Sequence, residues 1–265
     1  MENAMEERRA GRKTTLDAVW QKGGCALNGW LATPSAFAAE VMAGAGWDSL
    51  TVDMQHGLAD YRTAVAMIAA VNTTKTAALA RVPWLDEGMI MRTLDAGADG
   101  IICPMINNRA DALRLAAASR YPPLGKRSFG PIRARLVFGD SYAEVANSLP
   151  VLAMIETAEA VENADAILSV PGISGVYAGP SDLAYSFGCE IAAPFSPPVR
   201  EALDEILAAA RRNNSRAGVH TLSPKEGDAM RKKGFDLVTI QSDVRLLTAA
   251  ARAVVRGFHG GGGEK

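Results

Sequence analysis

The stretch GVYAGPSDLAY, residues 175–185, joins a short apolar run to a helix-like segment through the turn Gly-Pro-Ser-Asp. An apolar run that ends in a turn and opens a helix is typical of one βα unit of a parallel sheet. Taken alone, Ser181 or Asp182 would be interpreted as the cap of that helix, because short polar side chains accept hydrogen bonds from first-turn N–H groups. A chemical role for Asp182 has to be argued from the other units.

The same alternation of strand and helix patterns recurs along the chain. Eight apolar runs have strand character, and they cover residues 25–33, 49–55, 76–82, 100–106, 151–156, 175–179, 217–222 and 236–241. Eight βα units in 265 residues favour a closed barrel over an open, doubly wound sheet. We therefore predict an α/β protein with a single (β/α)₈ TIM barrel.

The barrel is expected to span residues 20–256 as the catalytic domain. Residues 1–19 would form an N-terminal extension or first helix, and the glycine-rich residues 257–265 a flexible tail. One connection, residues 121–150, is too long for a simple turn, and we expect it to form a lid or a subunit contact.

Composition excludes several classes of partner. Hydrophobic residues make up 48% and charged residues 22% of the chain, as in a globular protein with a large core. The net charge of −1 gives no field that would attract nucleic acid or an anionic membrane, and no apolar run is long enough to span a bilayer. The widely spaced Cys25, Cys103 and Cys189 favour a reduced, cytoplasmic protein.

Polar residues at the ends of the predicted strands are the candidates for chemistry, because barrel enzymes place their active sites there. Glu156 and Asp182 end neighbouring strands, which run roughly 5 Å apart, so both carboxylates can face one divalent cation. With no cysteine or second histidine nearby, Mg²⁺, Mn²⁺ or Co²⁺ is favoured over structural zinc. The alternative is that each carboxylate only starts or caps a helix.

Three further residues are candidates for acid–base or electrostatic work. His56, after the second run, can act as a general base, although a solvated loop histidine is the alternative. Arg81, after the third run, suits a carboxylate or an enolate oxygen, although an arginine paired with an aspartate of a neighbouring loop is the alternative. Asp95 lies at the end of a predicted helix, where its charge opposes the helix dipole, so we expect it to have a partner elsewhere.

Two common cofactor chemistries are not indicated. No lysine lies in a predicted strand or at its end, where a Schiff base would need one. No G-x-G-x-x-G follows a strand and opens a helix, which disfavours nicotinamide and flavin chemistry.

Six motifs in a fixed order carry a family resemblance. They are VDMQHG (52–57), ARVPW (80–84), LDAGADGIICPM (94–105), RYPPLGKRSFGP (120–131), AMIET (153–157) and GVYAGPSDLA (175–184). Together they resemble the HpcH/HpaI family of class II pyruvate aldolases within the phosphoenolpyruvate/pyruvate superfamily, and most closely its 4-hydroxy-2-oxoheptanedioate and hydroxyketoacid aldolases. The resemblance covers residues 20–255.

The resemblance implies a carbon–carbon lyase that cleaves and forms 4-hydroxy-2-oxo acids. Pyruvate or hydroxypyruvate would be the enolate donor and an aldehyde the acceptor. Glu156 and Asp182 would bind the metal, Arg81 would contact the ketone or enolate oxygen, and His56, paired with Asp95, would act with a metal-bound water in proton transfer.

The resemblance also implies how the substrate and the subunits are held. Backbone N–H groups of Gly179, Ser181 and Asp182 would bind the substrate carboxylate. Trp30 and residues 121–150 would shape the pocket. Exchange of the last helix between barrels would give a homo-hexamer, a trimer of dimers.

Two positions depart from the family pattern. Gln55, which with Asp53 would support the site, stands where many members have glutamate, so one negative charge near the metal is missing. Gln241 stands where the family often has glycine, and acceptor specificity could differ there.

Two other functions remain open at the sequence level. A citrate lyase β-like enzyme acting on a CoA thioester would need a basic grip, for which Arg127, Arg133 and Arg135 form the available cluster. A non-catalytic barrel that senses a metal or keto acid is the other, although the presence of all four groups, His56, Arg81, Glu156 and Asp182, argues against it.

Overall fold

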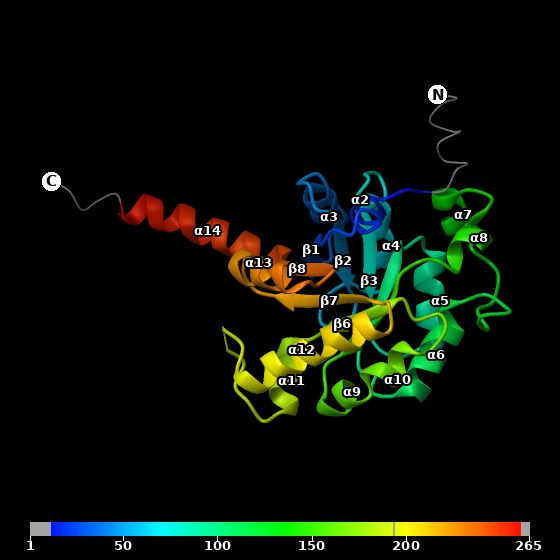
Figure 1. Cartoon of the computed structure of the whole chain (residues 1–265). Coiled ribbons are helices and arrows are strands. Elements are labelled where there is room, and N and C mark those ends of the chain that lie inside the picture. Colours follow the sequence, from blue (N-terminus) through cyan, green and yellow to red (C-terminus); the bar gives the residue numbers. More distant parts are fainter. Residues whose placement is uncertain (1–11, 193, 261–265) are drawn as a thin grey trace.

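The computed structural model describes residues 12–192 and 194–260. In this part of the chain, eight parallel strands close into a barrel in chain order (Figure 1). The strands are β1 (Ala26–Leu31), β2 (Ser49–Asp53), β3 (Ala77–Arg81), β4 (Gly100–Cys103), β5 (Val151–Ile155), β6 (Gly175–Ala178), β7 (Arg216–Thr221) and β8 (Leu237–Ser242). The predicted (β/α)₈ barrel is confirmed, and none of its strands contains a lysine.

Helices alternate with the strands and cover the outside of the barrel (Figure 1). They are α2 (Thr15–Gln21), α3 (Ala36–Ala43), α4 (Tyr61–Val71), α5 (Glu87–Asp95), α6 (Arg109–Ser119), α7 (Ile132–Phe138), α8 (Tyr142–Ala146), α9 (Ala158–Glu162), α10 (Ala164–Leu168), α11 (Pro180–Ser186), α12 (Pro197–Arg212), α13 (Pro224–Lys233) and α14 (Asp243–Gly260). Residues 121–150 therefore contain two short helices, α7 and α8, whose Phe138 and Tyr142 are buried. Burial of these rings gives the long connection its structure.

Short polar side chains start several of the helices. Ser35, Asp60, Asp86 and Asn108 each accept a hydrogen bond from a first-turn N–H group. Such caps satisfy N–H groups that have no partner inside the helix. These polar residues thus mark where four of the βα connections end and their helices begin.

Alternate residues of each strand point to opposite sides of the sheet, and this separates two cores. Leu79 of β3, Leu152 and Met154 of β5 and Tyr177 of β6 belong to the cluster inside the barrel. Their neighbours along the strands belong to the larger layer between sheet and helices. At the carboxyl ends of the strands, the side chains that point into the barrel are polar instead of apolar.

The two ends of the barrel chain meet at one seam. β1 pairs with β8, and the Asp243 carboxylate, just after β8, accepts hydrogen bonds from the N–H groups of Ala32 and Thr33 (3.0 Å each). At the opposite end of the barrel, Leu16 of α2 joins the inner core, and the Trp20 indole donates to the Asp236 carbonyl (2.8 Å). Helix α2 therefore closes the end of the barrel away from the strand carboxyl ends.

Helix α14 leaves the barrel and projects past it (Figure 1). Several of its apolar side chains are exposed, among them Leu247, Val254 and Phe258. It continues to Gly260, into the glycine-rich end for which a tail was predicted, and residues 261–265 lie outside the described residues. Within the part of the chain described, no helix is long and apolar enough to cross a membrane.

Candidate active site

An ion pair lies inside the carboxyl end of the barrel. Arg81, the last residue of β3, donates from Nε and Nη2 to the two oxygens of Asp53, the last residue of β2 (2.9 and 2.7 Å). Both side chains are buried. Although burial alone would raise the pKa of Asp53, the hydrogen bonds and charge of Arg81 hold it below its usual value. The pair fixes the guanidinium and leaves its Nη1 atom for a ligand.

Trp30 of β1 supports this pair. Its indole N–H donates to Asp53 (3.1 Å), and the Arg81 guanidinium carbon lies 4.9 Å from the centre of its ring. The ring also stacks on Tyr177, with 5.8 Å between centroids. Trp30 is only 4% exposed, so its main contacts are with the side chains that position Arg81.

Glu156 follows β5 and is 2% exposed. Its Oε1 atom accepts a hydrogen bond from the Met105 N–H group (2.8 Å). Burial, with a contribution from the charge of Asp182, raises the pKa of Glu156 to about 7, although Met105 and Arg81 act in the opposite direction. The helix that follows is capped by Thr157 instead, so Glu156 has no capping role.

The turn after β6 brings Asp182 to the same end of the barrel. Gly179 is the N-cap of α11 and Pro180 its first residue, and no side chain caps the helix. Ser181 and Asp182 are exposed, so the capping interpretation of either residue is wrong. The Gly179 N–H group already donates a hydrogen bond to the Ile155 carbonyl (3.2 Å). The first-turn N–H groups of Ser181 and Asp182 therefore remain available to bind an anion.

Gln55 and His56 follow β2, and their backbone N–H groups donate to Asp53 (3.0 and 3.2 Å). The His56 side chain is exposed at this end of the barrel. The Gln55 Oε1 atom is buried and has no hydrogen-bond partner within the described residues. It is an acceptor that a ligand could satisfy, because buried polar atoms are rarely left unpaired.

Asp95 has a partner, as the sequence led us to expect, and the partner is Arg127. Arg127 Nη2 donates to the Asp95 carboxylate (2.5 Å) and to the Tyr142 hydroxyl (2.8 Å), inside the segment 121–150. Among residues 12–192 and 194–260 no hydrogen bond or ion pair joins Asp95 to His56. The structure thus connects Asp95 to the α7–α8 region.

The other two arginines of that segment do not form one positively charged binding surface. The Arg133 guanidinium donates to the Ala96 carbonyl, while the exposed Arg135 pairs with Asp140 (3.1 Å). Arg127 is buried and paired with Asp95, and Arg133 is bonded to the backbone, so two of the three arginines already have partners inside the protein.

One residue of the site was missed from the sequence. His220 of β7 lies edge-on to Trp30, with 5.0 Å between ring centroids, and its Nδ1 atom is 3.3 Å from the Tyr177 hydroxyl. Burial and the nearby Arg81 charge lower the pKa of His220 to about 4. Strand parity could have identified it, because His220 stands two residues after the inward-facing Gly218.

Gln241 adopts a left-handed backbone conformation, with φ of 66°, beside a register shift between β1 and β8. Such a conformation is easiest for glycine, the residue that the family resemblance led us to expect at this position.

A divalent cation fits the carboxylates at this site. Glu156 is buried with no cationic side chain hydrogen-bonded to it, and Asp182 adds a second negative charge. Oxygen donors of this kind suit a hard cation. The described residues contain no group of three or more histidine, cysteine or acidic side chains placed to hold a metal, so the chain would supply two ligands, Glu156 and Asp182.

Comparison with known proteins identifies the family of the chain. The family model for HpcH/HpaI aldolase/citrate lyase matches residues 28–250. A hydroxypyruvate/pyruvate aldolase from Rhizorhabdus wittichii is 40% identical over 238 residues, which is 89% of this chain and 95% of the relative. A 4-hydroxy-2-oxo-heptane-1,7-dioate aldolase from Escherichia coli is 30% identical over 93% of this chain and 95% of the relative.

A solved structure has the same fold. The crystal structure of an HpcH/HpaI aldolase/citrate lyase family protein from Burkholderia cenocepacia superimposes with a TM-score of 0.83 at 29% identity, and covers 89% of this chain and 95% of that one. The chain belongs to the HpcH/HpaI aldolase/citrate lyase family. It is accordingly a carbon–carbon lyase of the aldolase type.

Proposed function

We propose that the protein is a metal-dependent, class II aldolase that cleaves and forms 4-hydroxy-2-oxo acids. Pyruvate or hydroxypyruvate would be the donor, as the name of the Rhizorhabdus wittichii relative suggests, and an aldehyde the acceptor. The observation that carries the proposal is the fixed Arg81–Asp53 pair beside a buried Glu156 that has no cationic partner.

Glu156 and Asp182 would hold the cation, which is Mg²⁺, Mn²⁺ or Co²⁺. When bound, a divalent cation polarises the carbonyl of a 2-oxo acid and makes the C3 protons more acidic. Gln55, with its unsatisfied Oε1 atom, would accept a hydrogen bond at the edge of this site. Asp53 would hold the Arg81 guanidinium in position by accepting its hydrogen bonds.

Arg81 would stabilise the negative charge that develops on the ketone oxygen, through its Nη1 atom. The Ser181 and Asp182 N–H groups would bind the carboxylate of the donor. His56 would take the proton from C3 as the general base, with Asp95 as its proposed partner. The C3 carbon then bonds to the aldehyde carbon and the aldehyde oxygen takes a proton; cleavage is the reverse.

Deuterium exchange at C3 of pyruvate, followed by NMR, tests the proposal without knowledge of the acceptor. The purified protein is treated with a chelator, and half is restored with Mn²⁺ or Mg²⁺. We expect exchange only in the restored sample. Exchange at equal rates in both samples would exclude the metal-dependent mechanism.

A CoA-ester lyase of the citrate lyase β type is less well supported. It needs a basic surface for the CoA phosphates, but Arg127 and Arg133 are engaged with Asp95 and the Ala96 carbonyl. A non-catalytic barrel is less well supported, since Arg81 is held by Asp53 and Glu156 is buried without a cationic partner, an arrangement that favours a chemical role.

We also propose that the protein forms a homo-oligomer, a hexamer built as a trimer of dimers, in which α14 packs on another barrel. The exposed apolar residues of α14 support this assembly, because single chains seldom expose a whole helix of this kind. A cytoplasmic location is supported by the absence of any disulfide among the three cysteines.

A further inference from the structure

His220 has no role in the mechanism above, yet it lies near the carboxyl end of β7, beside Trp30. It is half-buried, edge-on to Trp30, and close enough to Arg81 for that charge to disfavour the imidazolium form. A histidine held neutral can be a hydrogen-bond donor at one nitrogen and an acceptor at the other.

A line of buried polar side chains determines which nitrogen of His220 carries the proton. The Asn28 amide, deep in the barrel, donates to Thr239 Oγ1 (2.8 Å). Thr239 is 2.6 Å from the Tyr177 hydroxyl, which in turn is 3.3 Å from His220 Nδ1.

Each hydroxyl in this line must donate once. Thr239 accepts from Asn28, and among the described residues the Tyr177 oxygen is the only acceptor within reach of the Thr239 hydroxyl proton; we therefore assign the direction in which Thr239 donates to Tyr177 and Tyr177 donates to His220 Nδ1. His220 Nδ1 is then the acceptor, and the proton is on Nε2.

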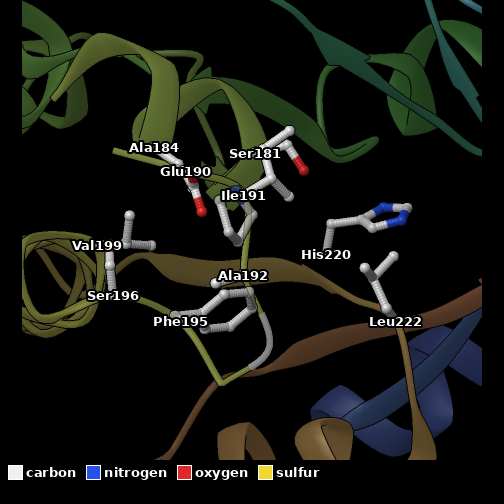
Figure 2. A pocket seen from close by; sticks show the side chains of 11 residues that line it. Ser181, Ala184, Glu190, Ile191, Ala192, Phe195, Ser196, Val199, His220 and Leu222 are labelled. Atoms are coloured by element: carbon white, nitrogen blue, oxygen red, sulfur yellow. The ribbon is translucent and has the colours of Figure 1, made fainter. Parts of the chain in front are cut away.

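The surroundings of His220 suggest what this donor binds. Figure 2 shows a pocket in which the His220 ring is directed away from Phe195 and Val199. The rest of the lining is mainly apolar, with Ala184, Ile191 and Leu222. Among the described residues that line it there is one charged side chain, Glu190, and no lysine or arginine.

We propose that His220 Nε2–H binds the carbonyl oxygen of the acceptor aldehyde, and that the adjoining apolar pocket selects aldehydes with an uncharged tail. The inference rests on the proposed aldolase function and extends it to the acceptor. A carboxylated acceptor would place its charge near Glu190, and the lining itself offers no lysine or arginine; Arg81 and Arg245, whose charges act on His220, lie outside that lining. An uncharged chain would bury apolar surface against Ile191, which is exposed, and Phe195, which is half-buried.

Two four-carbon aldehydes test the pocket, butanal and succinic semialdehyde, with pyruvate as donor. We expect kcat/KM to favour butanal by about tenfold or more in the native enzyme. Glu190→Arg should reverse or abolish this preference. Equal preference in the native enzyme, or a preference for the acid, would overturn the proposed acceptor class.

Three variants test the donor. His220→Leu should lower the ratio of butanal addition to pyruvate C3 exchange by about tenfold or more, because the aldehyde oxygen loses its partner while deprotonation does not use it. His220→Gln, which keeps an N–H group on a side chain of similar reach, should recover part of the loss. Lys232→Gln, on the exposed part of α13, is the control and should change neither rate.

Nitrogen-15 NMR of the histidine rings tests the hydrogen-bond line directly. We expect a neutral His220 with the proton on Nε2 at pH 6, and a mixture of tautomers in Tyr177→Phe. A proton on Nδ1, or equal loss of exchange and addition in His220→Leu, would overturn the role of His220 while leaving the aldolase proposal intact. Absence of metal-dependent exchange in the native enzyme would overturn both.

Discussion

At the scale of single residues, the burial of Glu156 has a measurable energetic cost in the metal-free protein. Its pKa of about 7 lies above the ordinary value of 4.5, so the folded chain keeps a proton that the unfolded chain releases. The difference favours unfolding as the pH rises through this interval. A bound cation would reverse the effect, since it stabilises the ionised carboxylate.

We therefore predict that chelator-treated protein loses up to about 3 kcal/mol of unfolding free energy between pH 5 and pH 8. Glu156→Gln keeps the acceptor for Met105 without the charge, so it should flatten this dependence and abolish stabilisation by Mn²⁺. Urea denaturation at several pH values gives the result. A variant with the pH dependence of the native protein would contradict the cause assigned to it.

The Asp53–Arg81 pair predicts a second effect at this scale. Asp53→Asn leaves a buried guanidinium without its charged partner, and we expect a loss of about 3–5 kcal/mol of unfolding free energy, together with C3 exchange. The matched control is Glu87→Gln in the pair with Arg114, where both side chains are more than half exposed. That change should cost less than about 1 kcal/mol. Similar losses in the two variants would refute the structural importance of the buried pair.

At the scale of elements, the connection between β6 and α11 has no room for a side chain at Gly179. An added Cβ atom would lie 2.8 Å from Met154 Cε and 2.9 Å from Glu156 Oε2. The backbone there has a φ of −106°, which any residue can adopt, so the requirement for glycine is one of space.

Gly179→Ala should consequently displace Glu156 and weaken Mn²⁺ binding by about tenfold or more, as measured by calorimetry. Gly44→Ala, at the end of α3, is the control, because its added Cβ atom meets only ordinary contacts, the nearest at 3.6 Å. Unchanged Mn²⁺ affinity in Gly179→Ala would show that Glu156 does not bind the metal.

Periodicity within the elements explains which parts of the site could be predicted from the sequence. Asp53, Arg81 and Glu156 end apolar runs whose strand identity is plain, and alternation places all three inside the barrel. His220 obeys the same rule but is followed by Thr221 and Leu222, so it was not recognised as a strand end. The contact of Asp95, at the end of α5, with Arg127, in the loop between α6 and α7, joins residues 32 apart, which no local pattern reveals.

At the scale of the whole molecule, α14 is the element least explained by the single chain. Its apolar side chains contact little of their own barrel, whereas those of α12, such as Leu203 and Ile206, are buried. An amphipathic helix gains most of its stability from packing, so α14 needs a partner surface.

We predict that the protein sediments as an oligomer, and that the double substitution Val254→Glu and Phe258→Glu shifts it to smaller species. Both side chains are more than 70% exposed in the chain alone, so the change should not disturb the barrel. Lys232→Glu, on the exposed part of α13, is the control. A monomeric native protein at micromolar concentration would refute the assembly.

The seam between β1 and β8 also affects how the chain is made. β8 is the last strand of the barrel to leave the ribosome, and β1, which it must pair with, is the first. Until then, one edge of β1 has no neighbour, and the hydrogen bonds from Ala32 and Thr33 to Asp243 cannot form. Nascent chains therefore expose an open sheet during synthesis, which is the stage at which chaperones would protect them from edge-to-edge association.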